Sequence, residues 1–208
     1  MEETWLKQWN DRYKAPAYAY GTSPNEFLKD QIEKLQTGKI LFGAEGEGRN
    51  AVYAATQGWT VDAFDISIEG QKKATQLALK NHVSIQYQVG LLPHLEYEDE
   101  HFDAIALIYA HFPPNIRSEY HKLLDRKLKK GGLIILEAFS KNHLAYRTKN
   151  PKVGGPPNLN ALFSIEELQS DFDNYEILEL TEKEIELSEG LYHNGTGSVI
   201  RFIGRKTS

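Results

Sequence analysis

Short apolar runs alternate along the chain with segments in which apolar residues recur at helical spacing. The runs are too short for helices and are rich in branched residues, so they predict five buried strands at 40–42, 59–64, 83–89, 102–108 and 133–139. Strands that alternate with helical segments are typical of an α/β protein with a doubly wound, mostly parallel sheet and helices on both faces.

Capping residues indicate where the intervening helices begin. Residues 3–13 carry two tryptophans one turn apart, which predicts a short amphipathic helix. Ser23, followed by a proline, is the expected N-cap of a second helix, and Ser67 is the expected N-cap of another. A proline pair opens a helix over residues 113–130, and two glycines are expected to end it.

The chain after the fifth strand is less regular. Residues 140–163 form the longest stretch without a clear period, and loops of this length are often lids over functional sites. We therefore expect an acceptor lid there, with His143, Tyr146 and Arg147 as candidate contacts. A capping box at Ser164 then predicts a further helix.

The last two predicted strands, at 175–180 and 198–205, complete a seven-stranded sheet as an antiparallel edge hairpin. Residues 191–195 contain the glycine and asparagine that such a turn requires. Tyr192 and His193 in this turn either line an acceptor pocket or serve only the turn.

A glycine-rich turn joins the first strand to the next helix through Gly43, Ala44, Gly46 and Gly48. Asp65 ends the second strand, 17 residues after Gly48. Strand, turn, helix, strand and acid form the nucleotide-binding βαβ unit. Its glycines let the backbone approach a ligand, its helix N-terminus offers free N–H groups, and its acid accepts from ribose hydroxyls. A tight turn without a ligand is the alternative.

Two carboxylates inside the turn, Glu45 and Glu47, bear on the identity of the ligand. Dinucleotide-binding turns hold a pyrophosphate, which carboxylates repel, whereas they attract a ligand with an ammonium and a sulfonium. The turn therefore favours S-adenosylmethionine over NAD. An NAD-dependent oxidoreductase is the second choice among enzymes.

The stretch from Phe42 to Ala55, followed by Val61 to Ser67, resembles the first two motifs of class I S-adenosylmethionine-dependent methyltransferases. The Phe-Asp pair of the fourth strand and the Lys-Gly-Gly before the fifth match the same family. The resemblance is closest to the tellurite-resistance-type and thiopurine-methyltransferase-like branch and extends over most of the chain. It implies a Rossmann-like fold and S-adenosylmethionine as the cofactor.

The resemblance also implies roles for individual residues. Asp65 would hold the ribose, and Ile66 would lie against the adenine or ribose. Many relatives have an acid in place of Phe42 and a glycine in place of Ala44, so Glu45 or a backbone carbonyl is expected to meet the amino group. The residues expected to bind the cofactor are Gly43, Ala44, Glu45, Gly46, Gly48, Asn50, Asp65, Ile66, Leu91 and Leu92.

The acceptor is expected beyond the fourth strand, because ligands of open α/β sheets bind at the carboxyl ends of the strands. Tyr109 and His111 follow that strand, and Tyr20 precedes the nucleotide-binding unit. A histidine has an ordinary pKa of about 6.5, so His111 is the candidate base, with Tyr20 or Tyr109 beside it. The alternative is a histidine that caps a helix or hydrogen-bonds a loop.

Composition limits the other classes of protein. The chain has 208 residues and no cysteine, which excludes disulfides, thiolate metal sites and cysteine nucleophiles. A net charge of −5 argues against a nucleic-acid partner, and the acidic run 96–103 indicates a solvated turn rather than a metal site. No apolar run is long enough to span a membrane, and the acidic start is unlike a signal peptide. We expect a cytoplasmic monomer or homodimer without a metal.

These features predict a single domain with an N-terminal helical lid (1–37), a cofactor-binding core (38–139) and an acceptor-side segment that ends in the hairpin (140–208). The predicted function is methyl transfer to a small, soft acceptor such as a thiol or a chalcogen oxyanion. The chemistry is an in-line displacement in which the protein positions the partners and excludes water. A cofactor-binding regulator without catalysis is the alternative outside enzymes.

Overall fold

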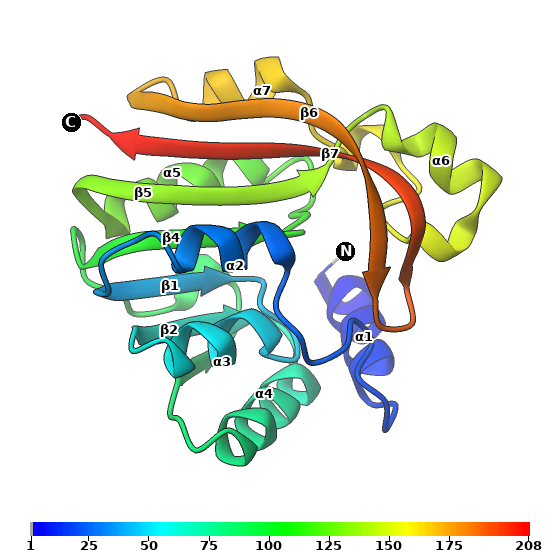
Figure 1. Ribbon diagram of the computed structural model, residues 1–208, viewed down its shortest axis with the longest axis horizontal. Coiled ribbons are helices and arrows are strands. Elements are labelled where there is room, and N and C mark those ends of the chain that lie inside the picture. The colour runs from blue at the N-terminus through cyan, green and yellow to red at the C-terminus, as the bar shows by residue number, and fades with distance from the viewer. Residues whose placement is uncertain (1) are drawn as a thin grey trace.

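The computed structural model describes residues 2–208, which form a twisted sheet with helices on both sides (Figure 1). The strands are β1 (Lys39–Gly43), β2 (Thr60–Asp65), β3 (Gln86–Val89), β4 (Phe102–Ile108), β5 (Leu128–Phe139), β6 (Tyr175–Glu189) and β7 (His193–Lys206). The α-helices are α1 (Glu2–Tyr13), α2 (Glu26–Ile32), α3 (Arg49–Thr56), α4 (Ile68–Lys80), α5 (Arg117–Lys127), α6 (His143–Lys149) and α7 (Ile165–Asp171). Short 3-10 helices lie at Leu92–His94, Pro151–Val153 and Leu159–Ala161. Within the described residues, none of these helices has both the length and the apolar character needed to span a bilayer.

The strand order is β3-β2-β1-β4-β5-β7-β6. Neighbours from β3 to β5 pair in parallel, whereas β7 is antiparallel to both β5 and β6. The predicted seven-stranded α/β sheet is therefore present. The chain order reverses between β1 and β4, and ligands of open sheets bind beyond the carboxyl ends of the strands at such a point.

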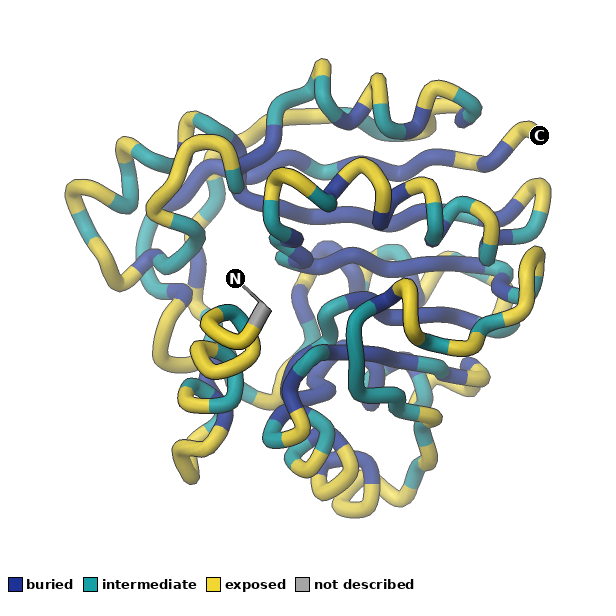
Figure 2. The backbone as a smooth tube through the Cα atoms, turned by 180° about the vertical axis from the view of Figure 1, so that it is seen from behind, coloured by how far each residue is buried: buried dark blue, intermediate teal, exposed yellow. Residues whose placement is uncertain are grey.

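Apolar side chains fill both faces of the sheet. Phe27 of α2 packs with Ile40 on one face, which α2 and α3 cover. Leu124 of α5 and Leu168 of α7 pack with Ile134 on the other face. The tube in Figure 2 is buried along the central strands and exposed along the outer sides of the helices. Strands buried on both faces need continuous apolar runs, which is why the sequence shows them clearly.

Most predicted helix caps are present. The Ser67 hydroxyl accepts from the backbone of α4, and Ser164 forms the predicted capping box at the start of α7. The prediction for α2 was wrong, because its N-cap is Asn25 rather than Ser23. The Asn25 side chain accepts a hydrogen bond from the Leu28 N–H at 3.0 Å. The sequence 23–25 offers two good capping residues, and tertiary contacts of Asn25 select the second.

The helix predicted over residues 113–130 is shorter at both ends. It begins at Arg117 and ends at Lys127, and Leu128 already pairs with Phe102 at the start of β5. Lysine is a good helix former, but helix propensity is a weak preference that pairing with β4 outweighs here.

The segment 140–163 is more regular than predicted. It contains α6 and two 3-10 helices, which are too short to give a recognisable period. Asn142 and Tyr146 of this segment hydrogen-bond Glu182 and Glu184 on β6. The expectation of an irregular loop was therefore wrong.

The C-terminal hairpin is much longer than predicted. Strands β6 and β7 have 15 and 14 residues, and the turn lies between Glu189 and His193. Its far half bends away from the sheet toward α1 (Figure 1). At the tip, the Leu191 N–H donates to the Ala19 carbonyl at 2.8 Å. The hairpin thereby ties the N-terminal segment to the edge of the sheet where a ligand is expected.

Candidate functional site

The turn between β1 and α3, which we call the elbow (residues 43–48), follows a left-handed path. Ala44, Gly46 and Gly48 have φ angles of 52°, 62° and 86°, in the region that favours glycine. A Cβ on Gly48 would lie 2.5 Å from the Cβ of Ala74, which leaves no room for a side chain. The backbone conformation of the elbow is therefore fixed, and Ala44 adopts a strained φ angle within it.

Glu45 caps the helix that follows the elbow. Its Oε1 accepts hydrogen bonds from the N–H groups of Asn50 at 3.0 Å and Ala51 at 2.8 Å. Burial raises the pKa of Glu45 to about 7, although both hydrogen bonds oppose this shift. A dinucleotide site offers such N–H groups to a pyrophosphate, and here a carboxylate already occupies them. This arrangement counts against NAD.

Glu47 has a different role from the predicted one. It accepts from the Ala19 N–H and from Lys73 Nζ, both at 2.7 Å, and is 5% exposed. The prediction that both carboxylates of the elbow face the ligand was therefore wrong for Glu47. A lysine of α4 neutralises it, and its hydrogen bonds hold the N-terminal segment against that helix.

Asp65 joins the elbow to the end of β2. Its Oδ2 accepts from the Gly46 N–H at 3.0 Å, and its Oδ1 accepts from the Ser67 N–H at 2.8 Å. Burial raises the pKa of Asp65 to about 6 against the effect of these hydrogen bonds. Each carboxylate oxygen can accept a second donor, so Asp65 can still bind hydroxyl groups.

A cavity of about 440 Å³ lies beside the elbow. This volume is within the range of sites that hold small molecules. Its elbow end is lined by Ala44, Glu45, Asn50, Asp65, Ile66, Gly90 and Leu92. Predicted Leu91 is not one of its lining residues, and Gly43, Gly46 and Gly48 shape the elbow instead of bordering the cavity.

This end of the cavity fits the cofactor that the sequence predicts. Asp65 has free acceptor capacity for the ribose hydroxyls, and Ile66 and Leu92 provide apolar contact for a base. Glu45 supplies a carboxylate for a cationic group. Phe42, where relatives have an acid, is buried and is not among the lining residues.

The rest of the cavity wall, which we call the acceptor end, is largely aromatic. Trp5 and Trp9 border it from α1, Phe139 from the end of β5, and residues 155–158 from the segment after α6. The predicted residues Tyr20, Tyr109 and His111 all border this end. The N-terminal helix and the segment 140–163 therefore meet over one cavity.

Tyr20 and Tyr109 differ in what their hydroxyls can do. The Tyr109 hydroxyl donates to Glu137 at 2.9 Å, and the backbone of Tyr109 has a strained φ of 54°. The Tyr20 hydroxyl accepts from Arg12 at 2.6 Å and keeps its own proton for another acceptor. Tyr109 is thus fixed as part of the wall, and Tyr20 is the one that can still donate.

Both ring nitrogens of His111 are engaged by the backbone. Nδ1 lies 2.9 Å from the Ala161 carbonyl, and Nε2 accepts from the Phe139 N–H at 3.2 Å. Burial lowers the pKa of His111 to about 3. A general base needs a free lone pair, so this geometry disfavours His111 as the base and matches the alternative of a loop-binding histidine.

His193 borders the same cavity and has one free nitrogen. Its Nδ1 donates to Glu189 Oε2 at 2.8 Å, while no group in the described residues hydrogen-bonds Nε2. Burial lowers the pKa of His193 and favours the neutral ring, although Glu189 opposes this shift. Its ring centroid lies 4.5 Å from that of Tyr20 and 4.7 Å from that of Tyr109.

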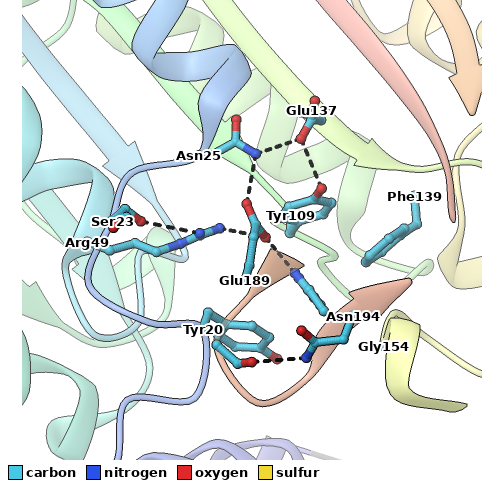
Figure 3. A network of polar contacts seen from close by, with 12 residues as sticks. Tyr20, Ser23, Asn25, Arg49, Tyr109, Glu137, Phe139, Gly154, Glu189 and Asn194 are labelled. Carbon is cyan, nitrogen blue, oxygen red and sulfur yellow. Dashed lines mark hydrogen bonds and ion pairs between the residues drawn. The ribbon is translucent and has the colours of Figure 1, made fainter. Parts of the chain in front are cut away.

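Glu189 orients His193 and was not recognised in the sequence. It also pairs with Arg49 at 3.0 Å (Figure 3). Burial opposes its ionisation, but the hydrogen bond from His193 and the charge of Arg49 lower the pKa of Glu189 to about 2. The Glu-to-His spacing of four across the hairpin turn is the signal that identifies the pair.

A second buried carboxylate, Glu137, supports this wall. It is fully buried and accepts from Asn25 Nδ2 at 2.7 Å, the Tyr109 hydroxyl at 2.9 Å and Arg201 Nε at 2.7 Å. Asn25 also reaches Glu189 at 3.2 Å, so one network joins α2, β5 and the hairpin (Figure 3).

Comparison with known families and structures adds to this geometry. Residues 40–132 match the model of a family described as a methyltransferase domain. No curated protein matches the chain by sequence.

Several solved structures share the fold. One comes from work on the conversion of a disulfide bond into a thioacetal group during echinomycin biosynthesis (TM-score 0.77, 15% identity, 99% of this chain and 92% of that chain). Another is an S-adenosylmethionine-dependent methyltransferase from Anabaena variabilis (TM-score 0.72, 17% identity, 98% and 94%). A third is TehB from Haemophilus influenzae (TM-score 0.68, 16% identity, 97% and 67%). At these identities the similarity concerns the fold.

Proposed function

We propose that this S-adenosylmethionine-dependent methyltransferase methylates a small molecule at a soft atom that carries a proton, a thiol above all, and that His193 takes the proton. The methyltransferase domain at residues 40–132 makes the protein an enzyme of this kind, with S-adenosylmethionine as its cofactor. When bound, the cofactor supplies an electrophilic methyl group on a sulfonium.

The observation that carries the proposal is the Glu189–His193 pair on the cavity wall. Glu189 holds the proton of the neutral ring on Nδ1, which leaves the Nε2 lone pair free. An alkyl thiol has a pKa of about 8.5 and is mostly protonated at neutral pH. A base that removes the proton therefore accelerates its methylation. A chalcogen oxyanion arrives deprotonated and has no need of one, which favours the thiol.

The aromatic wall supports the same proposal. Trp5, Trp9 and Phe139 make part of the acceptor end apolar. A soft thiolate loses less hydration than an alkoxide in such surroundings, and exclusion of water protects the displacement. Kinship with the tellurite-resistance-type branch is part of the proposal and is supported by the motif resemblance of the elbow.

Asp65→Ala is expected to weaken S-adenosylmethionine binding by about 1–3 kcal/mol, because charge-assisted hydrogen bonds to the ribose are lost. Calorimetric titration measures this change. Asp62→Ala is the matched control, because Asp62 lies on the same strand but is not a residue that lines the cavity. Equal affinities for the wild type and a folded Asp65→Ala variant would refute the ribose assignment.

The affinity for S-adenosylmethionine is expected to rise with pH. Burial raises the pKa of Asp65 to about 6 and that of Glu45 to about 7, so both are partly protonated below neutrality. A cationic ligand stabilises their ionised forms. Below neutral pH the two carboxyl groups must therefore lose protons when the ligand binds, which lowers its affinity. We expect roughly tenfold tighter binding at pH 8 than at pH 5.5.

Glu45→Gln should flatten this pH dependence, because the glutamine oxygen can still accept from the N–H groups at the start of α3 but does not ionise. Titrations in two buffers with different ionisation enthalpies count the protons released. A wild-type affinity that does not change over this range would contradict the assigned roles.

Turnover tests the function directly. The enzyme is incubated with S-adenosylmethionine and matched thiols, alcohols, amines and tellurite, and S-adenosylhomocysteine is quantified. We expect the thiols to be methylated fastest, with the methyl thioether as the product. Faster turnover of tellurite or of an alcohol than of every thiol would overturn the acceptor assignment.

A further inference from the structure

Two arginines of the cavity wall, Arg12 and Arg147, have no carboxylate partner in the described residues. Arg49, the third arginine of the wall, pairs with Glu189 at 3.0 Å. Both side chains are partly buried, and a guanidinium on a cavity wall without a counter-ion can bind the negative charge of a ligand. The pattern therefore points to an anionic group on the ligand.

Arg12 is held in place by neutral groups. Its NH1 donates to the Tyr20 hydroxyl at 2.6 Å. Its guanidinium lies 5.1 Å from the ring centre of Trp9 and 4.7 Å from that of Tyr192. These contacts fix the plane of the guanidinium and leave most of its N–H donors unused.

Arg147 is held in a similar way. Its Nε donates to the Gly155 carbonyl at 2.9 Å, which leaves its two terminal nitrogens without a hydrogen bond in the described residues. The bond anchors the side chain to the segment that borders the acceptor end of the cavity. A guanidinium with both terminal nitrogens free can bind a carboxylate through two parallel hydrogen bonds.

The residue that binds Arg12 contacts His193, and the segment that binds Arg147 contacts it through the neighbouring Gly154. The Tyr20 ring, which binds Arg12, is 4.5 Å from the His193 ring between centroids. Gly154, next to the residue that binds Arg147, packs so closely on His193 that a Cβ there would lie 2.6 Å from its Cδ2. Both unpaired cations therefore border the same cavity as the candidate base.

We infer that the methyl acceptor is an amphipathic thiol with an anionic group, best matched by a carboxylate, which Arg12 and Arg147 bind. This inference rests on the proposed function and names its substrate class. The apolar part of the acceptor packs against Trp9 and Phe139. Its thiol would give its proton to His193 as its sulfur takes the methyl group, with S-adenosylhomocysteine as the leaving group. Arg12 and Arg147 thus position the thiol beside the base.

The first test compares two thiols of equal size, 4-(mercaptomethyl)benzoate and 4-(mercaptomethyl)benzamide, in S-adenosylhomocysteine formation. One charge-assisted hydrogen bond corresponds to a factor of about 10–100, so kcat/KM should be at least tenfold higher for the acid, mainly through KM. Arg12→Gln and Arg147→Gln should each remove most of this preference, because each should lower kcat/KM far more for the acid than for the amide. Arg205→Gln is the control, because Arg205 pairs with Glu176 on the exposed part of the hairpin.

The second test measures binding without turnover. The enzyme saturated with S-adenosylhomocysteine is titrated with 4-methylbenzoate and with 4-methylbenzamide. Tighter binding of the acid by the wild type, lost in the two arginine variants, would support the anion site. If neither thiol were methylated, that result would count against the thiol proposal and not against the anion site. Equal binding and equal turnover of acid and amide by the wild type would overturn the inference, and the wild-type comparison depends on no variant.

Discussion

Replacement of His193 by glutamine is expected to lower kcat for thiol methylation by about 10²–10⁴-fold, the range that general-base catalysis contributes. Glutamine can still donate to Glu189 but offers no basic lone pair to the acceptor. Cofactor affinity should stay nearly unchanged, because His193 borders the acceptor end of the cavity and is not part of the elbow. Steady-state kinetics and calorimetric titration with S-adenosylmethionine measure the two effects.

The pH profile separates this role from a structural one. As the pH rises above the ordinary thiol pKa of about 8.5, the acceptor ionises without a base. The defect of His193→Gln should therefore shrink at alkaline pH, whereas a distorted site would stay slow. His94→Gln is the matched control, because His94 is exposed and is not one of the residues that line the cavity.

His111→Gln provides the decisive contrast. His111 binds Ala161 and Phe139 through both nitrogens, so its loss should lower stability more than kcat. Full activity of His193→Gln together with the loss of kcat in a folded His111→Gln variant would restore His111 as the base.

Glu137→Ala is expected to lower the free energy of unfolding by about 3–5 kcal/mol, because it breaks a largely buried ion pair and leaves Arg201 without its partner. Glu137 is fully buried and pairs with Arg201 directly across from it on β7. The variant also removes the acceptor of the Tyr109 and Asn25 side chains. Urea unfolding followed by circular dichroism measures the change.

Glu176→Ala is a closely matched control. Glu176 on β6 lies directly across from Arg205 on β7, the strand that also carries Arg201. The two side chains pair at 3.0 Å, but both are about half exposed. An exposed pair contributes about 0–1 kcal/mol, so this variant should be nearly as stable as the wild type. Similar losses of unfolding free energy in Glu137→Ala and Glu176→Ala would show that burial does not determine how much Glu137 contributes to stability.

The sequence predicts the sheet and the elbow well because their signals are local. Buried parallel strands need continuous apolar runs, and the glycines at 46 and 48 are required by left-handed backbone angles. Asp65 follows its strand at the spacing that the βαβ unit demands, and the structure places it on the cavity wall. These features depend on neighbours in the chain and can be read from them.

The acceptor end could not be predicted in the same way because its residues come from distant segments. Glu47 looks like a ligand carboxylate until α4 brings Lys73 to it. His111 looks like a free base until residues 139 and 161 bind its two nitrogens. His193 was noticed, but the long hairpin that carries it to the cavity was not expected.

Calorimetric titration of the wild-type protein with S-adenosylmethionine and with NADH tests the central claim most directly. The elbow has a carboxylate at the N-terminus of α3 where a pyrophosphate would bind, and Asp65 borders the cavity beside it. We therefore predict saturable binding of S-adenosylmethionine at one site and no detectable binding of NADH. Tight binding of NADH with no heat from S-adenosylmethionine would contradict the account.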